Sequence, residues 1–226
     1  MKSPIILCLV VLFLAGCSQP ISVYQVESGS QVLLAPTSDD AQLSEVSNQP
    51  DVVYDPSQCK LEPIIVPKLP DKIPGYVQLD KTTGLHVTGT PIEVDFATYR
   101  LEITGLVDNP LSLAYDDLRC MPRISAAPDL VCPGFFVDVA NWSGVPIKFL
   151  LEKAGIQLLA QQITLVSADG YSRSFSIEET LMEDDFLAYE LEGKPIPVLH
   201  GFPLRAVFPN LDGSHWIKWL VEIRVE

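Results

Sequence analysis

The sequence is poor in cysteine, in histidine and in positive charge. Its 226 residues include five cysteines and three histidines, and 15 lysines and arginines stand against 29 aspartates and glutamates. It contains no Cys-x-x-Cys pair, which excludes the usual motifs for a zinc site, for dithiol exchange and for a c-type haem. The net charge of −14 argues against binding nucleic acid or an anionic lipid surface by electrostatic attraction.

A single long apolar run stands at the start of the chain. Residues 4–15 are almost wholly apolar, follow one positive charge at Lys2, and lead into the sequence LAGC at 14–17. A run this short, ended by small residues, predicts a signal peptide and not a membrane span. LAGC resembles the lipobox of bacterial lipoproteins, which implies cleavage before Cys17 and a diacylglyceryl group on its thiol. An ordinary secretory signal with a chance cysteine is the alternative.

The predicted anchor implies a place in the cell envelope, on the periplasmic side. Ser18, and not an aspartate, follows Cys17. By analogy with Gram-negative lipoproteins, this favours the outer membrane over retention at the inner one. The signal also lacks a twin arginine, which indicates export as an unfolded chain.

Composition divides the chain into four segments. Residues 1–16 form the signal peptide, and residues 17–58, rich in Ser, Gln, Asp and Pro, read as a lipidated flexible tether. Residues 59–90 carry regularly recurring prolines and predict an extended arm. Residues 91–226 form the organised domain.

Hydrophobic patterning in that domain predicts many short strands and a few short helices, an α+β fold class. Strands are expected at 99–104, 162–167, 186–191, 204–208 and 217–225. Helices are expected at 112–118, at 145–154 before Gly155, and from Ser176, where Glu179 completes capping-box spacing. The stretch 120–142 is expected to be mostly irregular, with Cys132 in a loop and residues 142–146 opening a helix.

The chemistry-bearing side chains are one loop thiol and a few basic residues. The thiolate of Cys132 is a soft ligand suited to a soft metal centre. Arg205 and Lys218 are able to hold an anionic cofactor group, the arginine through two parallel hydrogen bonds. The competing interpretation is structural, because a lone cysteine is usually an inert apolar residue and His200 and His215 are usually hydrogen-bonded parts of a core.

Several ordered pieces together resemble the molybdopterin-binding domain of the sulfite oxidase superfamily. That superfamily includes the catalytic subunit of the periplasmic methionine sulfoxide reductase. The pieces are YRLEITG at 99–105, LSLAYDDL at 111–118, Cys132 with WSGVP at 142–146, DGY at 169–171, GKP at 193–195, GFPLR at 201–205 and KW at 218–219.

The resemblance implies a role for each matched position. Cys132 would bind molybdenum beside the pterin dithiolene, as its metal ligand and catalytic residue. The cofactor-contacting positions would be Ser167, His200, Arg205, Trp216, Ile217 and Lys218. The implied cofactor is molybdenum–molybdopterin, and the implied reaction is two-electron oxygen-atom transfer on a small-molecule substrate. Because no haem or iron–sulfur motif is present, electrons would pass to or from a separate electron-transfer protein.

The sequence departs from the pattern of this superfamily around the metal. Cys132 is followed by an apolar PGFF at 133–136, and the Asn-rich segment ahead of the first strand is replaced by HVTGTP, beginning at His86. The arginine-rich oxyanion pocket of sulfite oxidases is not evident, since Arg119, Arg123 and Arg173 are the candidates in the central region. Sulfite is therefore not the expected substrate.

Two classes of function remain open at this point. The first is a lipid-anchored molybdopterin-dependent oxidoreductase, favoured by the retained Cys132, Arg205 and Lys218. The second is a cofactor-free binding or scaffold lipoprotein that keeps the fold. The second is favoured by the export signal, because molybdopterin is normally inserted in the cytoplasm and an unfolded chain cannot hold it.

Three cysteines remain after processing. A Cys59–Cys120 disulfide would pin the proline-rich arm to the domain and leave Cys132 free for metal. A Cys120–Cys132 disulfide is the alternative, and it would consume the metal ligand.

Overall fold

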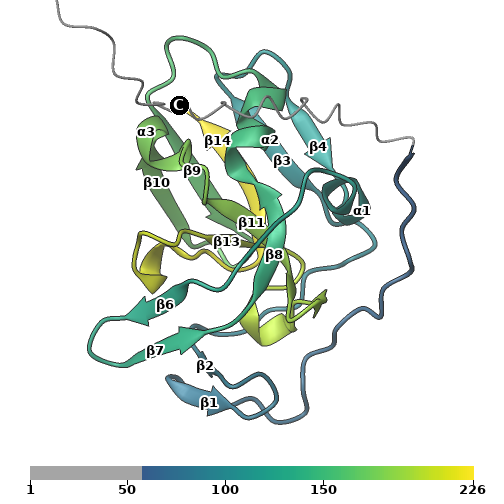
Figure 1. The fold of residues 1–226 in the computed structure, drawn as a ribbon, viewed down its shortest axis with the longest axis vertical. Coiled ribbons are helices and arrows are strands. Elements are labelled where there is room, and N and C mark those ends of the chain that lie inside the picture. The colour runs from purple at the N-terminus through teal and green to yellow at the C-terminus, as the bar shows by residue number, and fades with distance from the viewer. Residues whose placement is uncertain (1–57) are drawn as a thin grey trace, which may run out of the picture. The chain divides into compact units, whose positions relative to one another are not determined.

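The computed structural model describes residues 58–226, and two β-sheets dominate that part of the chain (Figure 1). The predicted signal peptide, Cys17 and all but the last residue of the predicted tether lie outside the described residues. The first sheet has the order β10-β9-β14-β3-β4. Strands β14 and β3 are parallel, and every other pair of neighbours in this sheet is antiparallel. Its strands are β3 (Leu101–Gly105), β4 (Leu111–Leu113), β9 (Gln162–Ser167), β10 (Ser172–Ser176) and β14 (Leu220–Val225).

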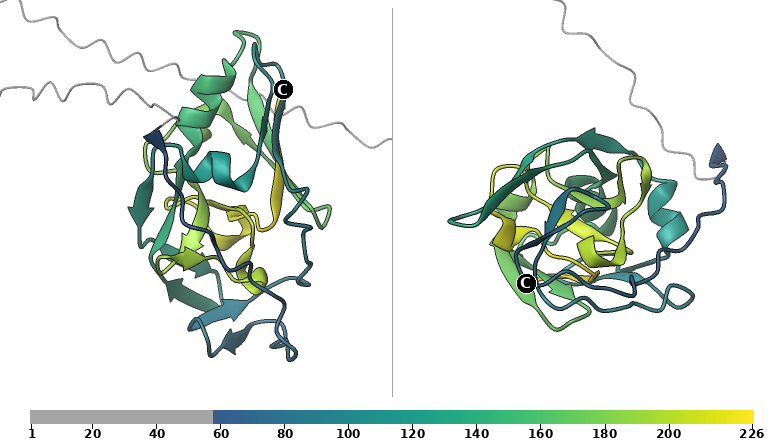
Figure 2. Two further views of the ribbon diagram at one scale, coloured as in Figure 1. Left: turned by 90° about the vertical axis from the view of Figure 1, so that its right-hand side faces the viewer. Right: turned by 90° about the horizontal axis from the view of Figure 1, so that it is seen from below.

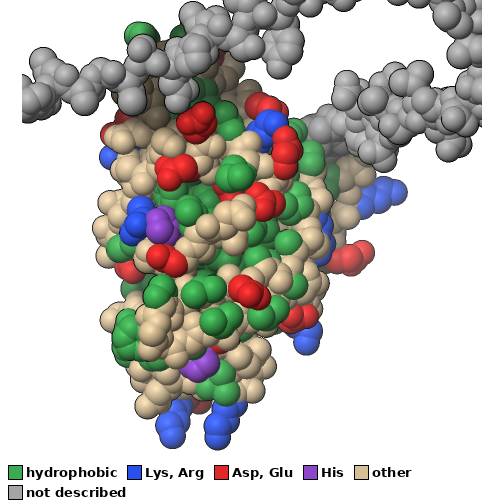
Figure 3. Space-filling model, turned by 60° about the vertical axis from the view of Figure 1, so that its left-hand side comes forward, with side chains coloured by type: hydrophobic (Ala, Val, Ile, Leu, Met, Phe, Trp, Pro, Cys, Tyr) green, Lys and Arg blue, Asp and Glu red, His purple; other side chains and the backbone are tan. Residues whose placement is uncertain are grey.

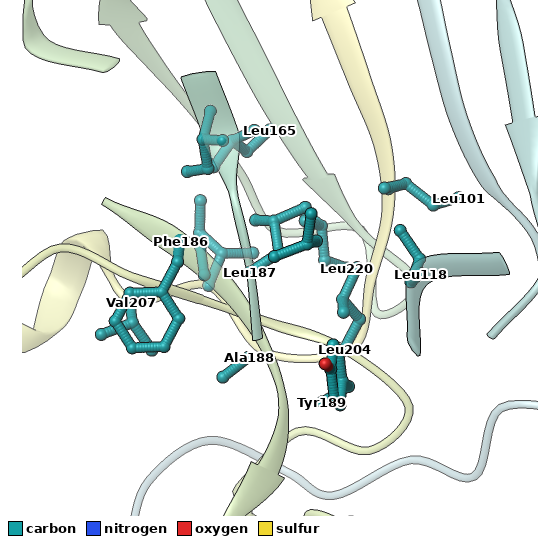
Figure 4. Packing of buried hydrophobic residues seen from close by; sticks show 14 of the residues in the cluster. Leu101, Leu118, Leu165, Phe186, Leu187, Ala188, Tyr189, Leu204, Val207 and Leu220 are labelled. Carbon is teal, nitrogen blue, oxygen red and sulfur yellow. The ribbon is translucent and has the colours of Figure 1, made fainter. Parts of the chain in front are cut away.

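The second sheet is antiparallel, with the order β12-β11-β8-β5 and β13 paired to β11. Its strands are β5 (Ile124–Ala126), β8 (Trp142–Pro146), β11 (Phe186–Leu191), β12 (Lys194–Pro195) and β13 (Arg205–Val207). Side chains from both sheets meet in one core: Figure 4 shows Leu165 and Leu220 of the first sheet clustered with Leu187 of the second. All three are fully buried, so burial of apolar surface holds the sheets together.

Short helices cover the ends of the strands. They are α1 (Tyr115–Arg119), α2 (Ile147–Ala154), α3 (Ile177–Thr180) and the 3₁₀ turns η2 (Val198–His200) and η3 (Gly213–His215). Two predicted helix ends are confirmed. Gly155 closes α2 with φ of 73°, and the Ser176 hydroxyl accepts a hydrogen bond from the Glu179 backbone N–H at the start of α3. No helix among the described residues combines the length and apolar character that a bilayer crossing requires.

Two hairpins lie at one end of the sheets, side by side in Figures 1 and 2. One consists of β1 (Gln78–Asp80) and β2 (Leu85–Val87), and the other of β6 (Asp129–Cys132) and β7 (Phe136–Val139). Strands β2 and β7 are in contact. The first hairpin lies inside the predicted arm, where the sequence analysis expected no strand.

The prediction of irregular structure at 120–142 is wrong, since that stretch contains β5, β6, β7 and the start of β8. The pattern misled because the outward residues of β6 and β7 are themselves apolar. Val131, Val137 and Val139 are 37%, 57% and 59% exposed, so no polar–apolar alternation marks the strands. Cys132 is therefore the last residue of a strand, not a loop residue.

Two predicted helix starts are also wrong. Residues 111–113 form strand β4, because Leu113 is buried and the Ser112 hydroxyl donates to Glu102 on the neighbouring strand. Residues 142–146 form the strand β8 and not a helix opening. Gly144 allows this close pairing with β11, because a Cβ there would lie 1.9 Å from the backbone oxygen of Leu187.

The predicted Cys59–Cys120 disulfide is confirmed, with the two Cα atoms 5.5 Å apart, and Cys132 is free. The disulfide joins the start of the arm to the residue after α1. Beside it, the Arg119 guanidinium donates to the backbone oxygen of Glu62 at 3.0 Å. The arm is thus fixed to the domain by a covalent bond and a charge-assisted hydrogen bond.

We expect the double substitution Cys59→Ser, Cys120→Ser to lower the free energy of unfolding by about 2–4 kcal/mol, because the disulfide closes a long loop of the unfolded chain. Urea unfolding measures the change. Peptide mapping after alkylation without reduction should give a Cys59–Cys120 peptide and an alkylated Cys132. A Cys120–Cys132 peptide would contradict the assignment. Cys132→Ser serves as the control and should leave the transition nearly unchanged.

Candidate functional site

Two adjoining cavities lie where the hairpins meet the loops that follow β9 and β13. The wide cavity, of about 210 Å³, is lined by Thr88, Gly89, Ser167, Asp169, Tyr171 and residues 213–214 and 216–219. The cysteine cavity, of about 40 Å³, is lined by His86, Thr88, Leu130, Cys132, Phe136, His200, Arg205, Gly213, Trp216 and Lys218. The two share Thr88, Gly213, Trp216 and Lys218, so they are parts of one site.

Cys132 presents the only cysteine thiol that is free among the described residues. It ends β6, pairs with Phe136 across the hairpin turn, and is partly buried. Burial, and beyond it the carboxylates of Asp212 and Asp138, raise the pKa of the thiol. The raised pKa favours the protonated thiol in the free protein.

Arg205 carries a buried positive charge in the same cavity. Its guanidinium packs against two nearly perpendicular indole rings, 4.7 Å from the ring centre of Trp142 and 5.5 Å from that of Trp216. Its Nη atoms donate to the backbone oxygens of His200 at 3.1 Å and Trp216 at 3.4 Å, while its buried Nε has no partner within residues 58–226. Burial lowers the pKa of Arg205 to about 9. A buried donor without an acceptor indicates a place prepared for another group.

Lys218 brings a second, largely buried cation to both cavities. Its ammonium donates to the backbone oxygens of Thr88 and, at 3.2 Å, Leu199, and it lies 4.7 Å from the ring centre of Trp219. Burial, followed by repulsion from Arg205, lowers the pKa of Lys218 to about 7. Neither cation belongs to an ion pair within residues 58–226. Asp138 and Asp169 favour the charged forms of Arg205 and Lys218 from a distance, but neither pairs with them, so an anionic ligand would find two buried cations outside any ion pair.

His200, predicted to contact a cofactor, lines the cysteine cavity but has its Nε2 engaged elsewhere. That atom lies 3.0 Å from the Asp80 carboxylate and 2.9 Å from the Thr83 hydroxyl. Burial lowers the pKa of His200 to about 4 in spite of the bond to Asp80, so the ring is neutral. His200 thus ties the β1–β2 hairpin to the site.

Ser167, Trp216 and Ile217 line the wide cavity, and their polar atoms hold the segment that carries Lys218. The Ser167 hydroxyl donates to the backbone oxygen of Lys218 at 2.7 Å. The indole N–H of Trp216 donates to the backbone oxygen of Phe208 at 2.9 Å, and the Ile217 backbone oxygen accepts from Ala206 at 2.8 Å. The structure therefore brings together every residue that the sequence analysis predicted at the site.

Sequence reasoning missed Asp138, and it considered His86 only as a candidate for lining the site, which the structure places it to do. Asp138 is buried and binds His86 twice, through the ring Nδ1 at 2.7 Å and the backbone N–H at 2.6 Å. An isolated aspartate inside the apolar sequence FFVDVA at 135–140 was the available signal, because a buried carboxylate needs a partner. Its partner, 52 residues away, could not be inferred from spacing.

The three arginines considered for an oxyanion pocket lie outside both cavities. Arg119 pairs with Asp116 at 2.9 Å, Arg123 pairs with Glu190 at 2.7 Å, and Arg173 lies on β10.

On the face turned forward in Figure 3, hydrophobic patches alternate with scattered acidic side chains, and basic side chains lie mainly toward the edges of the view.

Lys218→Met tests the electrostatic cost of the buried cations in protein prepared without cofactor. Because the folded pKa is about 7 and the unfolded value is about 10.4, the unfolded chain binds more protons between these values. Wild-type stability should therefore rise with pH across this window. The variant should be more stable at pH 6, by on the order of a few kcal/mol, with the difference fading near pH 10. Urea unfolding at several pH values measures the free energy of unfolding of the wild type and of the variant.

The exposed Lys194 provides the matched control, since Lys194→Met should follow the wild-type pH dependence. A Lys218→Met protein that is less stable than the wild type at pH 6 would contradict the assignment of Lys218 as an unpaired cation.

Comparison with known proteins places this site in a family. The oxidoreductase molybdopterin binding domain family matches residues 87–226. An uncharacterized oxidoreductase, YuiH, of Bacillus subtilis is 34% identical over 137 residues, which cover 60% of this chain and 69% of that protein. A putative protein-methionine-sulfoxide reductase subunit, YedZ1, of Azospira oryzae is 30% identical over 128 residues, covering 57% and 49%. The sulfite oxidase of Arabidopsis thaliana is 29% identical over 171 residues, covering 60% and 44%.

Among solved structures, the sulfane dehydrogenase SoxCD of Paracoccus pantotrophus has the same fold, with a TM-score of 0.57 and 21% identity. The likeness covers 84% of this chain and 59% of that one, and the chain spans less than half of the YedZ1 and sulfite oxidase relatives. The predicted α+β, sulfite-oxidase-type fold is confirmed. A free thiol beside two unpaired cations suits a metal that arrives with its own anionic ligands. The chain belongs to the oxidoreductase molybdopterin binding domain family, and its cofactor is molybdenum–molybdopterin.

Proposed function

We propose that this protein is a lipid-anchored enzyme that transfers an oxygen atom to or from a small substrate, exchanging electrons with a separate protein. The observation that carries the proposal is the meeting of the free Cys132 thiol with the unpaired cations of Arg205 and Lys218 in one pair of joined cavities. In a molybdenum–pterin cofactor the metal suits a soft thiolate ligand, and the phosphate suits charged hydrogen-bond donors.

Each of these residues has a defined task toward the cofactor. Cys132 would bind the metal as a thiolate, and Arg205 and Lys218 would hold the anionic pterin portion. When bound, the cofactor supplies two-electron oxygen-atom transfer. The buried Arg205 Nε has no hydrogen-bond partner within residues 58–226. The rings of Trp142 and Trp216, which are nearly perpendicular to each other, both contact the guanidinium and restrict its movement.

The cysteine cavity favours a small neutral oxo compound, such as a sulfoxide, over sulfite. The arginines that would form an oxyanion pocket lie outside it, and its two cations, Arg205 and Lys218, are assigned to the anionic pterin portion. The relative YedZ1, named as a putative protein-methionine-sulfoxide reductase subunit, is in keeping with this choice.

We expect the protein, purified from its native membranes, to contain about one molybdenum per chain and to give pterin fluorescence after oxidation, since the site suits that ligand. Cys132→Ser should lose the metal, because a hydroxyl does not replace a thiolate for a soft centre. With a reduced viologen as electron donor, the loaded protein should reduce dimethyl sulfoxide and should not oxidise sulfite in the presence of ferricyanide. Metal analysis and the two assays measure these outcomes.

The Cys59→Ser, Cys120→Ser protein is the control and should keep its molybdenum, because that disulfide does not line either cavity. Wild-type protein without molybdenum and without pterin would refute the enzyme and favour a cofactor-free binding or scaffold lipoprotein.

The lipid anchor accounts for the location that we propose, the periplasmic side of the cell envelope, with the outer membrane favoured. The LAGC sequence that ends at Cys17 supports it. Wild-type protein should enter the detergent phase on Triton X-114 partition, whereas Cys17→Ser should stay in the aqueous phase, since no acyl chains are then attached. Ser18→Ala is the matched control. A Cys17→Ser protein that still partitions with detergent would exclude the anchor.

A further inference from the structure

We propose that His86, held by Asp138 and Phe136, hydrogen-bonds the substrate oxygen at the Cys132 side of the site. This inference rests on the proposed function and names the side chain that receives its substrate. The family match begins at residue 87, so His86 lies just outside the matched residues. It comes from the β1–β2 hairpin, which lies within the predicted arm.

The position of His86 is set by two contacts on its own ring. The ring stacks on Phe136 with centres 4.4 Å apart and planes 13° apart. Its Nδ1 lies 2.7 Å from Asp138, whose other carboxylate oxygen accepts from the His86 backbone N–H at 2.6 Å. A carboxylate only accepts hydrogen bonds, so Nδ1 carries a proton. Asp138 and Phe136 thus fix both the plane of the ring and its tautomer.

The opposite nitrogen of the ring is left available. Within residues 58–226, Nε2 of His86 makes no hydrogen bond, and the side chain is 28% exposed while that of Asp138 is 3% exposed. His86 lines the cysteine cavity together with the Cys132 thiol. As an imidazolium it donates through Nε2 to a sulfoxide oxygen, and as a neutral ring it accepts from water or a hydroxyl.

The other basic side chains of the cysteine cavity have different tasks. Both Nη atoms of Arg205 and the Nζ of Lys218 donate to backbone oxygens, and Nε2 of His200 is bound to Asp80. His86 joins a ring held by Asp138 and Phe136 to a partly exposed side chain whose Nε2 makes no hydrogen bond within residues 58–226. It provides the polar contact that a neutral oxo substrate requires where an arginine pocket is missing.

Three anchors keep the hairpin that carries His86 in place. They are the Asp80–His200 bond at 3.0 Å, the Lys218 bond to the backbone oxygen of Thr88, and the His86–Asp138 pair. The first two join the hairpin to His200 and Lys218, which line the cofactor site. The position of His86 and the binding of the cofactor therefore depend on the same two residues.

The experiment compares His86→Phe with His215→Phe in molybdenum-loaded full-length protein. Both histidines bond an aspartate and contact a phenylalanine ring, but His215 lines neither cavity. His86→Phe should keep its molybdenum, and its kcat for dimethyl sulfoxide should fall roughly 100-fold with a much smaller change in KM. Added imidazole should restore part of the activity of His86→Gly. His215→Phe should behave as the wild type.

A second readout does not depend on turnover. In half-reduced protein labelled with ¹⁵N-histidine, pulsed electron paramagnetic resonance should detect a ¹⁵N coupling to molybdenum, additional to any from His200 in the same cavity, that His86→Phe lacks and His215→Phe retains. If this coupling is present but the wild type does not reduce dimethyl sulfoxide, the proposed substrate is wrong and the placement of His86 stands. Loss of molybdenum from His86→Phe, unchanged kcat, or absence of the coupling in the wild type would each overturn the inference.

Discussion

The burial of two cations without a counter-charge is the constraint on which the rest of the site depends. A guanidinium and an ammonium that have lost most of their water raise the free energy of the empty protein, as the lowered pKa values of Arg205 and Lys218 indicate. Backbone oxygens and indole rings offset part of this cost. An anion bound beside the two cations would offset the rest of this free-energy cost, and this would add to the affinity for an anionic cofactor.

The two sheets make this burial possible because they fix the segments that surround the cations. Strand β13 carries Arg205 and pairs with β11, the central strand of the second sheet. The segment with Lys218 leads directly into β14, the central strand of the first. Each cation is thereby held at or beside the end of a strand.

The hairpins supply two walls of the cysteine cavity. The β6–β7 hairpin presents Cys132 and Asp138 inward, while its valines face outward. The β1–β2 hairpin brings His86 to the same cavity and is tied there through Asp80 and His200. The free thiol and the imidazole that we propose to face the substrate thus come from two short hairpins that need the two sheets for support, because an isolated hairpin is at best marginally stable.

The sequence by itself determined the fold class, the strands with regular burial such as β9 and β11, the helix ends at Gly155 and Ser176, and the residues gathered at the site. These features depend on local periodicity, on capping chemistry and on an ordered set of motifs. Tertiary structure alone decided that residues 120–142 are strands, because their outward faces are apolar and carry no alternating signal. It also decided the pairing of His86 with Asp138, since two residues so distant in sequence meet only when β2 packs against β7.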